Sequence, residues 1–269
     1  EQLQAIAPKD PGSQYLRAFV DFQRDRLDSA RTAIEAVLRQ GPDNIAAQLL
    51  AGAIYLKLED HIQAQHYLES VLAKVPGQSL ARRYLAASLL ATGEAVRARE
   101  LLEPVVSAEH DPVTMTLAGQ AFLASGDFDQ AAQQFTHAVE AQPDDVKART
   151  RLAVASLWSG DQGRAVAELE EAVRLDASSG QPDLALVMTL LRAGEYDKAL
   201  EAQQALEEKQ PDNPQTYNLK GGIYLAKSNP AEARKAFEKA LSLKADFLPA
   251  AVNLARLDVR EGQLEAAEQ

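Results

Sequence analysis

Apolar and small residues along the chain follow the three- and four-residue spacing of amphipathic helices, in segments separated by Gly and Pro. In residues 112–141 this pattern occurs twice. Apolar side chains fall at Leu117, Ala121, Leu123 and Ala124, and then at Ala131, Phe135, Ala138 and Val139. Gly126 lies between the two sets, so the spacing predicts two helices joined by a short turn.

The same two-helix pattern returns along the chain at a fixed distance. The stretch "GDFDQAAQQFTHAVEAQPDD" (126–145) reappears, two periods later, as "GEYDKALEAQQALEEKQPDN" (194–213). An alanine marks the same point of each copy: Ala30, Ala64, Ala98, Ala131, Ala165, Ala199, Ala233 and Ala267. Consecutive alanines lie about 34 residues apart, which is the period of a helical repeat array. Only the step from Ala98 to Ala131 is shorter than the others, by a single position.

If this alanine is taken as position 20 of each repeat, several other positions also hold the same type of residue in most repeats. Position 8 is Ala or Gly in seven repeats, position 15 is Gly in five, and position 24 is large and mostly apolar. Ten of the 12 prolines lie at positions 32–34 or 1–3. Small residues let two helices approach closely, Gly suits a left-handed turn residue, and Pro ends one helix and begins the next. The pattern therefore predicts that each repeat consists of a helix A, a short turn, a helix B and a short loop.

These marks resemble the tetratricopeptide repeat (TPR) family, which combines a small residue at position 8, Ala at 20, a large residue at 24 and Pro at 32. The resemblance covers the whole chain, although position 4 lacks Trp and the third repeat is one position short. It implies an all-α fold, a right-handed TPR superhelix (α-solenoid) of antiparallel helix pairs.

The period divides the chain into seven expected TPR repeats and two partial ones. The complete repeats are expected at 11–44, 45–78, 79–111, 112–145, 146–179, 180–213 and 214–247. Residues 1–10 read as the tail of a preceding repeat and residues 248–269 as an incomplete eighth. Both ends fall inside a repeat, so we expect a piece of a longer array. Bare apolar residues there, such as Leu3 and Ile6, predict end-to-end self-association.

The composition of the chain argues against several classes of function. The net charge of −11 argues against nucleic acid as a partner, and no run of 18 apolar residues predicts a membrane span. Cysteine is absent, which excludes thiolate chemistry and fits cytosol or periplasm equally well. The four histidines, His61, His66, His110 and His137, share no position in the repeat and predict no metal site. We therefore expect no enzyme activity, no cofactor and no metal.

A closer resemblance is carried by three stretches: "PGQSLARRYLAASLLATGEAVRARELLEP" (76–104), residues 191–241 and "FLPAAVNLARLDVREGQLEAAE" (247–268). They are similar to the bacterial TPR lipoproteins of the exosortase/PEP-CTERM protein-sorting system. The resemblance implies a periplasmic array that is tethered to the outer membrane by a lipid. It also implies a scaffold that mediates protein–protein interaction in exopolysaccharide production and protein sorting at the envelope.

In TPR proteins, positions 2, 5, 6, 9, 12 and 13 of helix A tend to line the concave groove, and here these 48 positions hold none of the 39 acidic residues. They do hold seven basic residues, and the aromatic side chains there could instead pack between repeats. The groove-binding candidates are Tyr15, Phe19, Lys57, Arg83, Tyr84, Lys147, Arg151, Trp158 and Arg192. The expected partner is a protein or peptide segment, of acidic character. The alternative is an anionic polysaccharide or its export machinery.

Three of these basic residues, Arg83, Lys147 and Arg151, resemble the basic members of the TPR carboxylate clamp by their positions in the repeat. The two Asn positions of that clamp fall on Ala87 and Leu117. The sequence therefore favours a looser cationic site over a true clamp.

Overall fold

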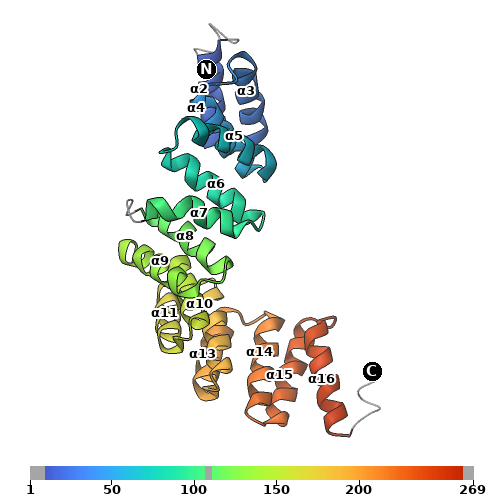
Figure 1. Cartoon of the computed structure of the whole chain (residues 1–269). Coiled ribbons are helices and arrows are strands. Elements are labelled where there is room, and N and C mark those ends of the chain that lie inside the picture. The colour runs from blue at the N-terminus through green and yellow to red at the C-terminus, as the bar shows by residue number, and fades with distance from the viewer. Residues whose placement is uncertain (1–9, 107–110, 263–269) are drawn as a thin grey trace. The chain divides into compact units, whose positions relative to one another are not determined.

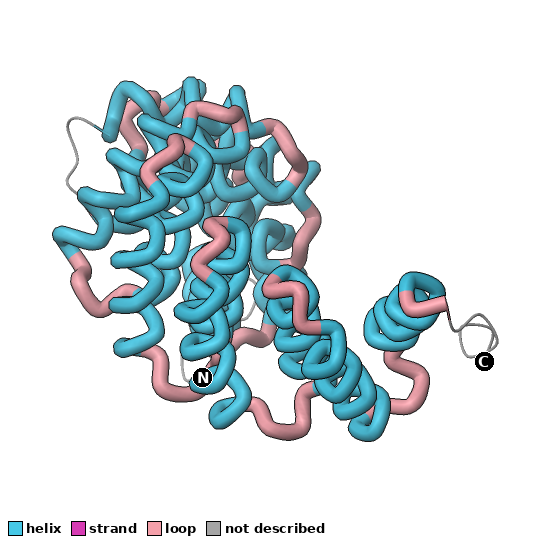
Figure 2. Tube along the Cα trace, turned by 90° about the horizontal axis from the view of Figure 1, so that it is seen from below, coloured by secondary structure: helices cyan, strands magenta, loops and turns pink. Residues whose placement is uncertain are grey.

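A computed structural model describes residues 10–106 and 111–262 of the chain (Figure 1). These ranges contain fifteen helices and no strand, so the predicted all-α fold of antiparallel helix pairs is confirmed. Figure 2 shows the helices joined by short loops. The predicted tail in residues 1–9, the segment 107–110 with His110, and residues 263–269 with Ala267 lie outside the described residues.

Two kinds of helix alternate along the chain. The helices A are α2 Pro11–Gln23, α4 Ile45–Lys57, α6 Ser79–Ala91, α8 Pro112–Ala124, α10 Val146–Trp158, α12 Gln181–Arg192, α14 Pro214–Ala226 and α16 Leu248–Arg260. The helices B are α3 Leu27–Gln40, α5 His61–Lys74, α7 Ala95–Val106, α9 Phe128–Ala141, α11 Gln162–Leu175, α13 Tyr196–Lys209 and α15 Pro230–Leu243.

The helices fall into two compact blocks, which are described separately. The N-terminal block, residues 1–141, contains α2 to α9, and the C-terminal block, residues 142–269, contains α10 to α16. Within each block, each helix A from α2 to α14 packs against the helix B that follows it, and each helix B packs against the next helix A of its block. The core is therefore continuous along a block.

The core of each repeat forms where helix A and helix B cross. All seven described alanines at position 20 have 0% exposed area. At position 8, a Cβ added to Gly119 would lie 2.7 Å from the Phe135 ring at position 24, and one added to Gly52 would lie 2.5 Å from Leu68. Gly221 and Phe237 repeat this arrangement. Glycine is required in these repeats because the large side chain of helix B occupies the space beside the helix A backbone.

The turn between helix A and helix B is left-handed at position 15 in every repeat that has a described turn. Five of these residues are glycines, such as Gly194 with φ of 77°, and the other three are Asp25, Glu59 and Ser228 with φ of 57–60°. The following N–H closes the turn on the carbonyl five residues back, as in Glu195 N to Leu190 O at 3.0 Å. This Schellman-type bond satisfies a carbonyl at the end of helix A.

Position 4, which lacks the family's Trp, holds at several junctions a hydrogen-bond donor that joins consecutive repeats. In four repeats its side chain donates to the carbonyl of the proline at position 32, six residues earlier. The pairs are Gln48 with Pro42 (2.8 Å), Arg82 with Pro76 (2.7 Å), Arg149 with Pro143 (2.9 Å) and Tyr217 with Pro211 (2.9 Å). These bonds fix the loop that enters each helix A.

We predict opposite effects for the same substitution at two glycines of the C-terminal block. A Cβ would meet nothing within 4 Å at Gly194 or at Gly222, but only Gly194 has positive φ. Gly194→Ala should lower the free energy of unfolding by about 1 kcal/mol, because alanine is strained there. Gly222→Ala, inside α14, should raise it by about 1 kcal/mol through helix propensity. Urea denaturation measures both, and two changes of the same sign would contradict the turn assignment.

We also predict that Gly221→Ala destabilises the protein by roughly 1–3 kcal/mol, because its Cβ would overlap the Phe237 ring. The double variant Gly221→Ala with Phe237→Leu should recover part of this loss, since Ala86 and Leu102 are buried together at the same two positions of another repeat. Denaturation of the single and double variants gives the coupling energy. Strictly additive effects would show that the two positions do not constrain each other.

Candidate functional site

In the C-terminal block, the candidates on α10 form one stripe along the helix. The Asp145 side chain caps α10 by accepting from the backbone N–H groups of Lys147 (2.9 Å) and Ala148 (3.1 Å). Lys147, Arg151 and Trp158 then follow at intervals of four and seven residues, which places them on the same face. We call this set, together with the residues of α12 described next, the cationic stripe.

Trp158 and Arg192 are brought together across two consecutive helices A, α10 and α12, which pack against each other. The Arg192 guanidinium carbon lies 5.8 Å from the centre of the Trp158 ring, a cation–π contact. The Trp158 side chain is nevertheless 57% exposed. Met188, one turn before Arg192, is 55% exposed and adds a flexible apolar surface that the sequence analysis did not predict.

The basic residues of the stripe are spread rather than clustered. Lys147 is exposed and makes no ion pair with a described residue, and Arg151 is half-buried. The helical rise places Lys147 and Trp158 about 16 Å apart along α10. The arrangement suits an extended ligand that contacts several groups in turn, and it does not form a compact catalytic pocket.

In the N-terminal block, the helix A candidates are less accessible. Phe19 is 44% exposed beside Leu16 and Val20 on α2, whereas Tyr15 and Tyr84 are partly buried. On α4 two of the groove positions are buried, at Leu50 (7% exposed) and Ala53 (5%). The groove positions of this block therefore do not form an evenly accessible cationic surface.

The two basic candidates of the N-terminal block hold neighbouring repeats together. Lys57 lies 5.2 Å above the centre of the Phe22 ring and pairs with Asp25 at 2.9 Å. Arg83 pairs with Asp111 at 2.8 Å. These contacts give both side chains a structural role.

Asp111 also caps α8, since its carboxylate accepts from the backbone N–H and the hydroxyl of Thr114, each at 2.8 Å. Burial alone would raise the pKa of this carboxyl, but the hydrogen bonds from Thr114 and Arg83 outweigh it and lower the pKa. Arg83 is thereby anchored to a charged helix cap.

Three cavities of about 330–510 Å³ lie away from the predicted groove, at equivalent junctions between repeats. Each is lined by positions 25 and 28 of one repeat and by positions 4 and 11 of the next. These residues are Glu35, Leu38, Gln48 and Tyr55; Glu103, Val106, Met115 and Phe122; and Gln204, Glu207, Tyr217 and Tyr224. The sequence analysis missed them because two or three helices contribute to each cavity.

The cavity of the first junction contains a tyrosine–carboxylate pair. The Tyr55 hydroxyl donates to the Glu35 carboxylate at 2.7 Å, and the Tyr55 ring stacks on Tyr67 with 5.7 Å between their centres. Burial, and then the hydrogen bond to Glu35, raise the pKa of Tyr55. The hydroxyl therefore remains a proton donor in this contact at neutral pH.

Within residues 10–106 and 111–262, no group of three or more His, Asp or Glu side chains is arranged to hold a metal ion. No helix in the same ranges is long and apolar enough to cross a membrane.

Several solved structures share the fold. A tetratricopeptide repeat protein from Parabacteroides merdae is 16% identical over 96% of this chain and 99% of its own, with a TM-score of 0.66. YrrB, described as a TPR protein with an unusual peptide-binding site, is 19% identical over 68% of this chain and 95% of its own, with a TM-score of 0.55. A double mutant of MamA RS-1 is 19% identical over 61% and 93%, with a TM-score of 0.57.

Family models settle the assignment. No curated protein matches the chain. A tetratricopeptide repeat model matches residues 15–62, 116–182 and 184–246, and a second one matches residues 55–115. The matches extend over more than half of the sequence and agree with the buried alanines and the left-handed turns of the structure. The chain therefore belongs to the tetratricopeptide repeat family.

Proposed function

We propose that this protein is a non-enzymatic scaffold that binds segments of other proteins through the helix A face, with the cationic stripe of the C-terminal block as its principal contact. The observation that carries the proposal is the exposed Trp158 ring beside Arg192, on a face that also holds Lys147 and Arg151 and has no acidic residue at its groove positions. Membership of the TPR family and the likeness to YrrB, described as binding peptide, support a peptide as the ligand.

The chemistry of the stripe favours an acidic peptide. Arg guanidinium groups bind carboxylates through paired hydrogen bonds, and an exposed Trp ring offers a large rigid contact area. Each exposed charge contact contributes only about 0–1 kcal/mol, so the affinity would come from several contacts along an extended segment. The binding would weaken as salt rises.

The alternative ligand is an anionic polysaccharide, because the same guanidinium groups bind sugar carboxylates and the Trp158 ring could stack on a sugar. The three sequence stretches that resemble the exosortase/PEP-CTERM lipoproteins support a periplasmic, lipid-tethered setting and a role near exopolysaccharide production. Fractionation of cells that produce the native protein tests that setting. Recovery in the cytosol would contradict it.

We predict that Lys147→Glu with Arg151→Glu weakens binding of a blocked ten-residue polyglutamate peptide by at least about tenfold, by reversing two charges on the stripe. Trp158 is the sole tryptophan of the chain and lies on the stripe, so its fluorescence reports this binding directly. The wild-type affinity should fall with added salt, whereas a neutral polyglutamine peptide should bind weakly at every salt concentration.

The matched control is Arg174→Glu with Lys198→Glu, which makes the same change of net charge on exposed residues of the helices B α11 and α13. This control should keep the wild-type affinity. Equal loss in both double variants would mean that net charge, and no specific site, attracts the peptide. Preference for alginate, an anionic polysaccharide, over polyglutamate would favour the alternative ligand.

A further inference from the structure

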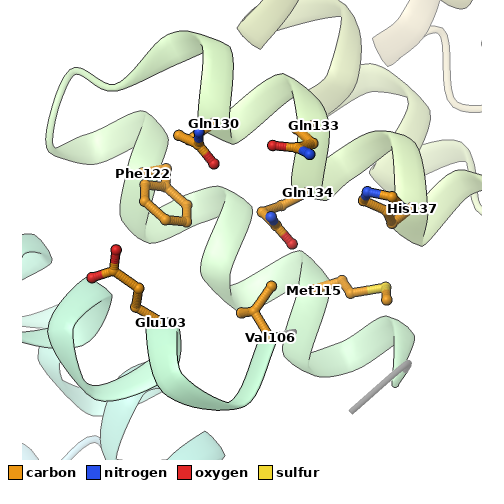
Figure 3. A pocket seen from close by; sticks show the side chains of 8 residues that line it. All are labelled: Glu103, Val106, Met115, Phe122, Gln130, Gln133, Gln134 and His137. Atoms are coloured by element: carbon orange, nitrogen blue, oxygen red, sulfur yellow. The ribbon is translucent and has the colours of Figure 1, made fainter. Parts of the chain in front are cut away.

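The cavity between α7, α8 and α9 differs in chemistry from the helix A face. It has a volume of about 330 Å³ and is lined by Glu103, Val106, Met115, Phe122, Gln130, Gln133, Gln134 and His137 (Figure 3). Only Met115 and Phe122 come from a helix A, at positions 4 and 11, and neither is a groove position. This site is therefore separate from the one proposed above.

Gln134 is the central feature of the cavity. Its side chain projects between α8 and α9 toward the middle of the site (Figure 3). The residue is only 7% exposed, yet its amide oxygen has no hydrogen-bond partner among the described residues. A buried amide without a hydrogen bond lowers the free energy of unfolding. A leucine at the same position would not carry this penalty. A ligand that donates a hydrogen bond to this oxygen would remove that cost.

Two more amides extend the polar wall. Gln130 and Gln133 lie on the same face of α9 as Gln134, and Figure 3 shows all three around the cavity, with His137 one turn further. The side chains of Gln130 and Gln133 are exposed and make no side-chain hydrogen bond with a described residue. Each amide offers both a donor and an acceptor, which is the pairing pattern of a peptide group.

The other lining residues narrow the ligand class. No Lys or Arg lines the cavity within the described part of the chain, and Glu103 is the one carboxylate there, so neither an anion nor a strong cation is favoured. Phe122 (6% exposed) and Met115 (5%) form an apolar floor and leave no open ring face for a sugar to stack on. The cavities at the two equivalent junctions carry more charge, including Arg39 in one and Lys220 in the other.

We infer that this cavity is a second binding site, which takes an uncharged peptide segment whose amide groups hydrogen-bond to Gln134, Gln130 and Gln133. Its volume is at the small end of the range of ligand sites, so it accommodates a short segment with small or amide side chains. The protein would then bind one partner through charge on the helix A face and another through neutral amides between its helices.

The test uses the whole chain labelled with ¹⁵N-glutamine and a terminally blocked hexapeptide of alternating asparagine and glycine. The side-chain amide signal of Gln134, identified by its loss in Gln134→Leu, should shift on titration with millimolar peptide. Gln134→Leu should weaken binding by about tenfold, the loss expected for a buried hydrogen bond. The same variant should have a higher denaturation midpoint, which separates loss of the site from misfolding.

Gln40→Leu is the control, since Gln40 is an exposed glutamine of α3 outside the cavity. It should leave peptide binding unchanged, and Trp158 fluorescence should not respond to the neutral peptide in either protein. The inference is overturned if the peptide does not bind, if it binds Gln134→Leu as tightly as wild type, or if maltotriose shifts the Gln134 signal and the peptide does not. A lowered denaturation midpoint for Gln134→Leu would show that water or protein already satisfies the amide, and would also overturn it.

Discussion

The close crossing of helix A and helix B within each repeat is the constraint on which the structure depends. Glycine at position 8 faces Phe or Leu at position 24 in three repeats, and the alanine at position 20 is fully buried wherever it is described. A helix pair of this length has a small core of its own, so the backbones must approach closely to exclude water. Packing of each pair on its neighbour then builds the core of a block, and it leaves helix A side chains at the surface, where they can contact a partner.

The junctions between repeats differ in the residue at position 4 and in the side chains that line the cavities there. In four repeats, position 4 holds Gln, Arg or Tyr, whose side chain donates to a proline carbonyl of the preceding loop. This hydrogen bond positions the loop that enters helix A. Cavities lie at three junctions, two with such a donor at position 4 (Gln48 and Tyr217) and one with Met115, and each has its own side-chain chemistry. One scaffold can therefore present different sites at equivalent positions.

Some basic residues of the helices A form ion pairs within the fold, and others remain accessible to a ligand. Lys57 and Arg83 fasten consecutive repeats through Asp25 and Asp111, so their charge is neutralised by loop carboxylates. Arg192 instead contacts the exposed ring of Trp158. A ring carries no net charge, so this contact does not neutralise the positive charge of Arg192. Basic residues at matching positions of the repeat thus differ in what they can bind, because the neighbouring loop decides whether an acid is within reach.

The all-α fold, the pairing of helices and the left-handed turns could be predicted from the amino acids alone, because they depend on local constraints that recur in every repeat. Glycine at position 15 and the small residues at positions 8 and 20 act within a single repeat, so a periodic pattern reveals them. Three-dimensional packing was needed to show that Trp158 meets Arg192, that Lys57 and Arg83 are engaged, and that Gln134 is buried without a described partner for its amide oxygen. Each of these depends on side chains from two or three helices, whose individual rotamers and distances no periodicity encodes.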